Sequence, residues 1–325
     1  MTETMATGGH WRRAFSSGEI RALRRVSNLQ GAWMVASNWL LIVAALALVG
    51  WRPNVLTVAL AVVLIGSRQL GLAIVMHEAA HRTLFTNRRL NDWAGNWLAA
   101  YWTFLSVELY RPYHLQHHAH TGSERDPDLA LKRGFPATPG SMARKVARDL
   151  LGIVGLKRLV GTAGFLMSAA WGKRARKGQA VTFMGTEVSR GDAVRALLGF
   201  ATTQGALAGA LWALGRPELF LLWAGAWLTT QNLVTRIRSI AEHAMTPPTD
   251  DPFQNTRTVR AGWLARLFVA PNRVNHHLEH HLLMTVPHHQ LPRLHAMLRE
   301  RGLLEGARVA DSYGQVLRAA AGSGG

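Results

Sequence analysis

Cysteine is absent from the 325 residues of this chain. The absence excludes disulfide bonds, iron–sulfur clusters and thiolate zinc sites built from this chain alone. Acidic residues are scarce as well: 19 Asp and Glu stand against 37 Lys and Arg, which gives a formal net charge of +18. Basic faces bind nucleic acid backbones, but the sequence shows no nucleic-acid-binding motif. Because the charge flanks long apolar segments, membrane topology and anionic lipid head groups explain most of it, and an acidic protein partner fits the rest.

Long apolar segments are present, and their lengths predict the fold class. Segments of about 20 residues are long enough to cross roughly 30 Å of hydrocarbon. Four such segments lie near residues 32–50, 54–76, 193–215 and 218–237. Very short connections join them in two pairs. We therefore expect an all-α integral membrane protein whose four transmembrane helices form two hairpins below a cytoplasmic helical cap.

Basic residues set the expected orientation, because short segments rich in Lys and Arg remain on the cytoplasmic side. Such residues crowd 1–30 and 132–190, whereas each hairpin turn holds a single Arg. Both termini are then cytoplasmic, and a bacterial inner membrane is the expected location. No cleavable signal is evident in residues 1–30, which we expect to be a basic cytoplasmic or interfacial segment. Residues 31–318 should form a single membrane domain, and 319–325 a disordered tail.

Three histidine clusters punctuate the chain, at His77-Glu78-Ala79-Ala80-His81, His114-Leu115-Gln116-His117-His118 and His277-Leu278-Glu279-His280-His281. Spacings of three and four residues place the imidazoles of each cluster on one face of a helix. Neutral imidazole is a ligand for zinc, copper, iron and nickel. Eight histidines are too many for one tetrahedral metal, and they suit two metals with four or five ligands each.

All three clusters fall on the cytoplasmic side of the predicted topology. This requires that the apolar segment at 92–109 does not cross the membrane, so we expect it to be a re-entrant or interfacial element. Residues 150–171 are also apolar, but Lys157, Arg158 and several Gly interrupt them. That pattern is typical of an amphipathic helix at the interface.

The second predicted span runs directly into the first cluster. At about 100° per residue, Gly66, Leu70 and His77 share one small, apolar helix face. Such a face suits a channel for an alkyl chain and equally suits close helix packing, which favours small residues in membranes. Arg68 lies on the opposite face, so we expect it to have a structural or snorkelling role.

Histidine ligands beside a bilayer favour oxidation of an apolar substrate, because unactivated C–H bonds require a strong oxidant. Carboxylates in the same segments are candidates to accept the second ring N–H of a ligating histidine. Taken singly, each is explained at least as well as a solvated acid. These candidates are Glu78, Glu108, Asp126, Asp128, Glu242 and Glu279.

The combined pattern resembles the membrane fatty-acid desaturase and hydroxylase superfamily, which is recognised by three histidine boxes. The likeness covers roughly residues 65–300 and extends to the residues around the boxes. These residues are Leu84-Phe85 and Leu90-Asn91-Asp92, then Arg111, Thr121 and Asp126-Pro127-Asp128, and finally Asn275, Val286-Pro287, Leu291-Pro292 and Leu294-His295. The last run is most similar to acyl-lipid desaturases.

This resemblance implies a non-haem diiron centre held almost wholly by histidine, with O2 as co-substrate. His243 would join the ligands because it matches a family histidine near the cytoplasmic end of the fourth span. One iron would be held by His77, His81, His118 and His280. The other would be held by His114, His117, His243, His277 and His281. The remaining histidines match no ligand position.

The resemblance also implies the reaction and the partners. We expect a fatty-acyl desaturase that forms a C=C bond in an acyl lipid, an acyl-CoA or an acyl-carrier protein substrate. Electrons must come from an external donor such as ferredoxin or cytochrome b5, because no cytochrome b5 segment is fused to the chain and it has no cysteine for an iron–sulfur or rubredoxin module.

Alternatives within and outside the superfamily remain open at this point. Hydroxylases, ketolases and acetylene-forming enzymes share the same boxes. The H-E-x-x-H pattern at 77–81 also matches the signature of a zinc protease, here an intramembrane one, but that interpretation leaves two clusters unexplained. A non-enzymatic metal transporter requires ligands at mid-bilayer, whereas these clusters lie at or beyond the ends of the spans.

Overall fold

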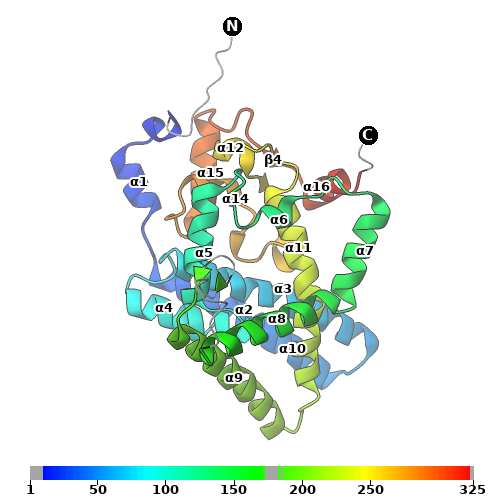
Figure 1. Ribbon diagram of the computed structural model, residues 1–325. Helices are drawn as coiled ribbons and strands as arrows, with labels where there is room; N and C mark the ends of the chain where they lie inside the picture. Colours follow the sequence, from blue (N-terminus) through cyan, green and yellow to red (C-terminus); the bar gives the residue numbers. More distant parts are fainter. Residues whose placement is uncertain (1–9, 173–181, 184–185, 323–325) are drawn as a thin grey trace.

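The computed structural model describes residues 10–172, 182–183 and 186–322, and most of them are helical (Figure 1). Two short 3-10 helices, η1 and η2, lie among the α-helices of the first half. In order, this half comprises η1 (His10–Ala14), α1 (Ser17–Leu23), α2 (Asn28–Trp51), α3 (Val55–Ala80), α4 (Arg88–Trp97), η2 (Ala100–Thr103), α5 (Val107–His120), α6 (Leu129–Lys132), α7 (Pro139–Leu150) and α8 (Ile153–Ala170).

The second half begins with a small antiparallel strand pair and continues with helices. Its elements are β1 (Thr182–Phe183), β2 (Thr186–Glu187), α9 (Arg190–Ala213), α10 (Leu219–Leu228), α11 (Thr230–His243), α12 (Pro252–Asn255), β3 (Thr258–Val259), α13 (Trp263–Phe268), η3 (Pro271–Arg273), α14 (His277–Leu282), η4 (His288–Gln290), α15 (Leu291–Glu300), β4 (Val309–Ala310) and α16 (Tyr313–Ala320). Strands β3 and β4 pair in parallel.

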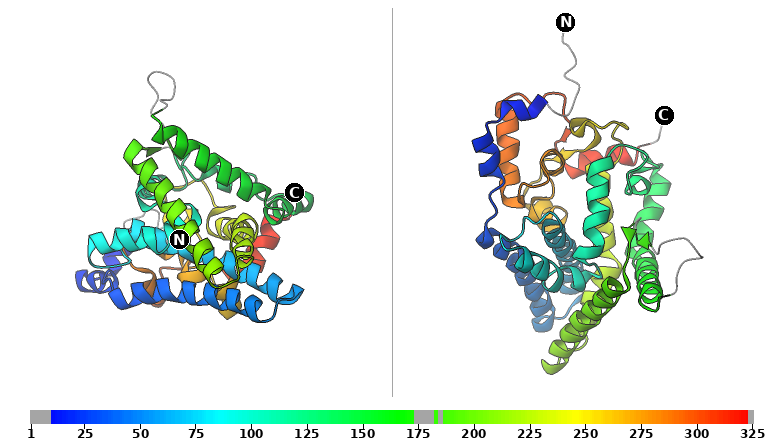
Figure 2. Two further views of the ribbon diagram at one scale, coloured as in Figure 1. Left: turned by 90° about the horizontal axis from the view of Figure 1, so that it is seen from below. Right: turned by 60° about the vertical axis from the view of Figure 1, so that its left-hand side comes forward.

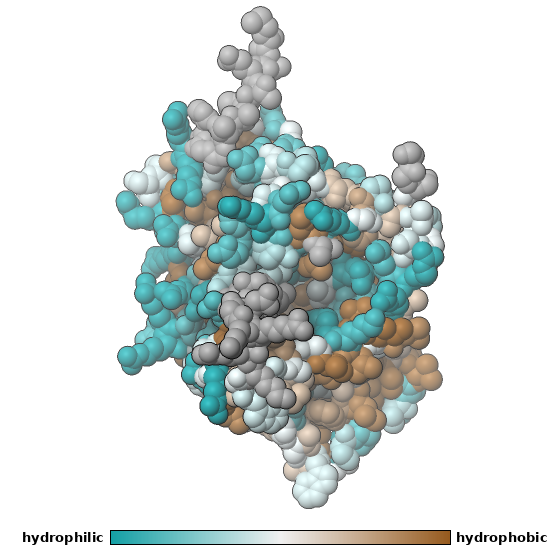
Figure 3. Space-filling view, in the orientation of Figure 1, coloured by the Kyte–Doolittle hydropathy of each residue, from teal (hydrophilic) through white to brown (hydrophobic). Residues whose placement is uncertain are grey.

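The molecule has an apolar half and a polar half. Helices α2, α9 and α10 lie in the lower half of Figure 1, and Figure 3 shows hydrophobic residues gathered there and hydrophilic residues above. Large apolar side chains remain exposed in this half, including Trp51 (73%), Val55 (87%) and Trp212 (75%). Exposed apolar surface of this kind has to be covered by lipid or protein. The chain is a membrane protein.

Among the described residues, four helical stretches are long and apolar enough to cross a membrane. They are Ser17–Trp51, Val55–Ala80, Ile153–Ala170 and Arg190–Ala213. Three of them contain predicted spans, those near 32–50, 54–76 and 193–215. In 150–171, α8 is long and apolar enough to cross a membrane, whereas an amphipathic helix at the interface was expected, and its placement stays a prediction. Its Arg158 is not part of a polar face but donates to the side-chain oxygens of Gln231 (3.1 Å) and Asn232 (2.6 Å) in α11.

The predicted span at 218–237 is not one helix. It is divided into α10 and α11 at Thr229, whose φ and ψ of −115° and −86° are not helical. The Asn232 side-chain amide donates to the carbonyls of Trp227 (2.8 Å) and Leu228 (3.0 Å) and so competes with the helical pattern. The other apolar segment, 92–109, is likewise not one helix, since it comprises most of α4, then η2 and the start of α5. Its placement at the interface stays a prediction.

Helix α3 is the centre of the bundle and contacts α2, α10 and α11, and also α4 and α5 near the first histidine cluster. Its Gly66 permits the close approach of α11, since a Cβ there would lie 2.1 Å from Oγ1 of Thr230. The Gly66 face therefore serves helix packing and not an open channel. Arg68 is buried and donates to the carbonyl of Leu267, which agrees with the structural role expected for it.

The N-terminal helices pack onto the segment that carries the third histidine cluster. Trp11, Phe15 and Leu23 form a buried apolar cluster with residues of α14 and α15, among them Leu278 and Leu294. Figure 2 shows the same arrangement from a second direction, with α1 beside α15. At the other end of the chain, the predicted tail begins too early, because Ala319 and Ala320 form the last turn of α16. Residues 1–9 and 323–325 lie outside the described residues.

Candidate metal centre

Four helices bring the predicted ligands together. Helix α3 ends at the first cluster, with His77 in its last turn and His81 as its C-cap. Helix α5 carries the second cluster, α11 ends at His243, and α14 begins at His277 and carries the third cluster. Residues more than 200 positions apart in the chain thus meet at one place.

The first group contains five histidines, each with one ring nitrogen within 4.8 Å of those of the others. The Nε2 atom of His118 lies 3.0 Å from Nε2 of His114 and 3.0 Å from Nε2 of His280. Metal–nitrogen bonds of roughly 2.0–2.1 Å place two ligand nitrogens of one metal roughly 3–4 Å apart. The members of this group are His77, His81, His114, His118 and His280.

The second group contains His117, His243, His277 and His281, again with nitrogens within 4.8 Å of one another. The shortest pair joins Nε2 of His277 to Nε2 of His243, at 2.7 Å. The two groups are neighbours, because the ring centroids of His118 and His281 are 4.2 Å apart. The nine predicted ligands therefore form two adjacent sets.

His114 lies in a different set from the one that the resemblance implied. Its nitrogen points to His118 in the first group, whereas the expected partition placed it with His117. The reason is helical geometry: His118 is four residues after His114 and follows it on the same face of α5. The hydroxyl of Tyr110 lies 3.2 Å from Nδ1 of His114, so that its Nε2 is directed to the first group.

The unpaired ring nitrogens of these histidines are consistent with a pair of bound metal ions. Several buried ring nitrogens have no hydrogen-bond partner among the residues that the structure describes: both nitrogens of His77, Nε2 of His81 and of His281, and Nδ1 of His280. Buried polar atoms are almost always satisfied, so unpaired nitrogens that converge are the donor set that a metal requires.

The protonation state suits metal binding as well. Burial holds the pKa of the imidazoles well below its usual value at His81, His114, His118, His243, His277, His280 and His281. These histidines are therefore neutral near pH 7, and neutral imidazole is the form that binds a metal.

Comparison with known proteins agrees with this centre. A model of the fatty acid desaturase family matches residues 50–312. The chain belongs to this family. Dihydrorhizobitoxine desaturase of Bradyrhizobium elkanii is 31% identical over 301 residues, which are 89% of this chain and 80% of that protein. The match shows that this desaturase-family chain is an oxidoreductase of the membrane fatty-acid desaturase and hydroxylase superfamily.

Relatives that are named as ketolases match a smaller part of the chain. Beta-carotene 4-ketolase 3 of Haematococcus lacustris is 33% identical over 131 residues, which are 40% of this chain and 39% of that protein. Zeaxanthin 4-ketolase of Chlamydomonas reinhardtii is 34% identical over 108 residues, 33% of this chain and 23% of that protein. Desaturase-family membership implies a lipid or acyl substrate and an electron donor in general terms.

Carboxylates orient ligands in the second group of this desaturase-family centre. The Nδ1 atom of His117 lies 2.8 Å from Oδ1 of Asp126. Burial opposes ionisation of Asp126, but hydrogen bonds with His117 and Lys132 bring its pKa to about 2, so it is a carboxylate. Glu242 lies 3.5 Å from Nδ1 of His277 and accepts from Nε of Arg238 at 2.6 Å. Partners of this kind fix the orientation of a ligating ring.

The other predicted carboxylates have different partners. Glu108 accepts hydrogen bonds from Asn96 and Ser106 and contacts no ligand ring. Asp128 accepts from Tyr113 and lies 3.5 Å from His117. Only some of the candidate acids therefore orient ligands.

Glu78 binds the backbone of the segment that follows the third histidine cluster. It accepts the backbone N–H of His288 at 2.9 Å and the hydroxyl of Thr83 at 3.0 Å, and it is buried. In a zinc protease this glutamate would be the general base, free to activate water. The family match and the two converging histidine groups therefore favour a desaturase-family centre over the zinc protease interpretation.

Three residues near the centre were not foreseen as its supports. Tyr110 contacts His114, Oγ1 of Thr121 lies 3.4 Å from Nδ1 of His281, and the carbonyl of Asn255 lies 3.3 Å from Nδ1 of His243. Tyr110 precedes His114 by one helical turn, which is a signal the sequence contains. The contact of Asn255 has no sequence signal, since it depends on the path of a loop.

A third group of potential metal ligands lies outside the two histidine groups and comprises His276, Glu279 and His295. Both carboxylate oxygens of Glu279 have partners in the protein. Nδ1 of His295 lies 2.6 Å from Oε1, and the hydroxyl of Thr258 donates to Oε2 at 2.5 Å. These contacts hold α14 against α15 and β3. His120, His288 and His289 belong to none of these groups of described residues.

Proposed function

We propose that this chain is a membrane-bound, O2-dependent fatty-acyl desaturase with a histidine-ligated diiron centre. Two adjacent hydrogens would be removed from an acyl chain, so that a CH2–CH2 unit, O2, two electrons and two protons become CH=CH and two water molecules. The observation that carries the proposal is the convergence of nine histidines in two adjacent groups. Two irons, when bound, would supply the activation of O2 that the cleavage of unactivated C–H bonds requires.

The residues of the chain hold and orient this centre. His77, His81, His114, His118 and His280 would hold one iron, and His117, His243, His277 and His281 the other. Asp126 and Glu242 fix the rings of His117 and His277, and Tyr110 fixes that of His114. Burial of most of these rings excludes bulk water from the ligands.

Expression in a bacterial host of known lipid composition tests this proposal. The host with the wild-type chain should contain new unsaturated acyl chains, detected by mass spectrometry, that are absent with the His280→Ala variant. The His120→Ala variant is the matched control, because His120 lies on α5 outside both groups, and it should retain the product. New hydroxylated chains without new unsaturation would contradict desaturation.

A ketolase or hydroxylase is the second candidate. It is favoured by two relatives that are ketolases and match 33% and 40% of the chain. The desaturase relative matches 89%, so desaturation remains our first proposal. Acetylene formation is a further variant of the same oxidation. The same experiment separates these reactions, because the products differ from the substrate by two hydrogens for each bond order gained or by added oxygen.

The electron donor is proposed to be a small acidic protein such as ferredoxin; cytochrome b5 is an alternative. The formal charge of +18 supports docking by charge complementarity. The positive charge does not discriminate among the possible substrate carriers, which are an acyl lipid, an acyl-CoA and an acyl carrier protein. The rate of turnover with ferredoxin should fall as ionic strength rises, because salt screens such docking. A rate independent of salt would contradict it.

The centre and both termini are proposed to face the cytoplasm, in a bacterial inner membrane. The Arg-rich segments support this orientation. Because the chain has no cysteine, single cysteines are clean probes for a membrane-impermeant maleimide. In intact cells Pro53→Cys, in the first hairpin turn, should be labelled and Ser17→Cys should not. The opposite pattern would contradict this orientation.

A further inference from the structure

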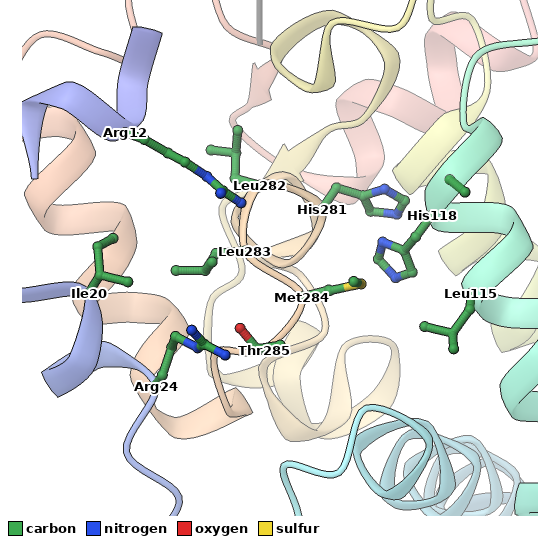
Figure 4. Close-up of a pocket in the computed structure, with 11 residues that line it drawn as sticks. Arg12, Ile20, Arg24, Leu115, His118, His281, Leu282, Leu283, Met284 and Thr285 are labelled. Atoms are coloured by element: carbon green, nitrogen blue, oxygen red, sulfur yellow. The ribbon is translucent and has the colours of Figure 1, made fainter. Parts of the chain in front are cut away.

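A cavity of about 650 Å³ lies between the N-terminal helices and the metal centre. Its walls come from three parts of the chain: residues 12–24, the outer face of α5, and the end of α14 with the residues after it. Figure 4 shows Arg12 and Arg24 on one side of this cavity and the rings of His118 and His281 on the other. The volume falls within the roughly 300–1,000 Å³ typical of small-molecule sites.

The surface between the two ends of the cavity is largely apolar. Leu282 and Leu283 lie between the arginines and the histidines, and the side chain of Met284 extends toward the two rings (Figure 4). Ile20 and Leu115 complete the apolar lining on opposite sides. A molecule that fills this cavity meets cations at one end, hydrocarbon in the middle and candidate metal ligands at the other end.

No acidic residue that the structure describes neutralises the charge at the cationic end, since none of the described residues that line the cavity is acidic. The single acidic residue of α1, Glu19, points elsewhere, since it accepts from Arg301 and from the backbone N–H of Ser16. Arg12 and Arg24 are both exposed, and no carboxylate is paired with either among the described residues. Guanidinium groups bind carboxylates and phosphates through charge-assisted hydrogen bonds.

We propose that this cavity binds an amphiphilic substrate by its anionic head group, a carboxylate or a phosphate. Arg12 and Arg24 hold the anion, and the wall of Leu282, Leu283 and Met284 directs the alkyl part to His118 and His281. This inference rests on the proposed function for its reacting end, while the anion site itself stands on the cavity alone. Substrate selection thus depends on the N-terminal segment, outside the three histidine boxes.

Binding without turnover tests the anion site independently of the reaction. The metal-loaded protein in phosphatidylcholine nanodiscs is titrated, in the absence of reductant, with labelled decanoate, decyl phosphate and the neutral decanol, and empty nanodiscs give the background. Wild-type protein should bind at least one anion about tenfold more tightly than decanol. Preference for decanoate indicates a carboxylate substrate, and preference for decyl phosphate a phosphate head group.

Neighbouring arginines supply matched controls. Arg12→Gln and Arg24→Gln should each weaken anion binding about tenfold and leave decanol binding unchanged, while Arg12→Lys and Arg24→Lys retain the charge and part of the affinity. Arg13→Gln and Arg25→Gln change the same net charge at exposed residues that do not line the cavity, and should bind as the wild type does. Metal content and apparent melting temperature of each variant show that it is folded.

Three results would overturn the inference. Wild-type protein that binds decanol as tightly as either anion, or that binds no probe above background, has no anion site in this cavity. Equal weakening in the Arg13→Gln and Arg25→Gln controls would assign the effect to surface charge in general. A wild-type protein that binds the anions with arginine dependence but forms no unsaturated product would refute the proposed function and leave the anion site in place.

Discussion

Nδ1 of His117 and Oδ1 of Asp126 lie 2.8 Å apart, and Asp126 is 4% exposed. The pair directs the other ring nitrogen of His117 toward His243, His277 and His281. Lys132 contacts the second oxygen of the same carboxylate, so the chain of contacts runs from the protein surface to the candidate metal position.

We predict that Asp126→Asn lowers metal affinity and activity about 10–100-fold, the usual range for loss of a carboxylate behind a ligating histidine. The substitution preserves shape and removes the charge that fixes the ring. Iron content after dialysis, together with product yield, measures the effect. Asp311→Asn is the control, because Asp311 is paired with Arg260 at the surface and its side chain is 73% exposed. Equal losses in both variants would contradict the prediction.

The assignment of His114 to the first group gives a second prediction. Ala substitution of both His114 and His118 should remove about one metal ion per chain, because both lie in one group. Ala substitution of His114 together with His277 should remove both ions, since these two belong to different groups. Metal stoichiometry by mass spectrometry decides between the partitions. If the His114–His277 pair costs one ion and the His114–His118 pair two, His114 belongs to the second set after all.

Metal removal should destabilise the protein. Without the ions, both ring nitrogens of His77 and Nε2 of His81 and of His281 have no hydrogen-bond partner among the described residues. A ligand that binds only the folded state stabilises it in proportion to the logarithm of its concentration over Kd. An iron chelator at pH 8 is therefore expected to lower the apparent melting temperature in detergent, and added Fe²⁺ to restore it. The variant with Ala at His118 and His277 should already melt at the lower temperature and respond to neither reagent.

Packing of α3 against α11 gives a prediction about stability. In Gly66→Ala the new Cβ would lie 2.1 Å from Oγ1 of Thr230 and 2.8 Å from the backbone nitrogen of Gln231. Overpacking of this kind costs about 1–3 kcal/mol, so the apparent melting temperature should fall. In Gly209→Ala, on α9, the added Cβ has no described heavy atom within 4 Å outside its own stretch of helix. This variant should be neutral or stabilising, as Ala favours helix over Gly by about 1 kcal/mol. Similar behaviour of the two variants would show that α3 and α11 do not pack this closely.

How far the sequence predicts the site depends on the range of the interactions involved. The spacing within each box is local, so it identifies the ligands on α3, α5 and α14 and the turn of helix that carries each one. Family membership added His243, which the spacing does not single out. The resemblance placed His114 with His117, whereas its Nε2 lies 3.0 Å from that of His118 in the first group. The metal that His114 would bind stays a prediction.

The spans show the same division. Length and hydropathy were enough to identify three spanning stretches, since crossing a bilayer requires only a long apolar helix. They did not locate the break within 218–237, where the side-chain amide of Asn232 donates to two carbonyls of α10, a local contact. In 150–171 they did not specify that Arg158 has its partners on α11, which is a tertiary contact.

The sequence by itself predicted the candidate ligands of the three boxes, the membrane character and the family, because each follows from residue type and short spacing. Only the tertiary structure shows how the histidines are grouped, which acids lie beside them, and that Arg12 and Arg24 lie across a cavity from His118 and His281. Several of these relationships join residues far apart in the chain, as Arg24 and His118 are. They depend on how whole helices pack, and packing is set by the shape and burial of many side chains together.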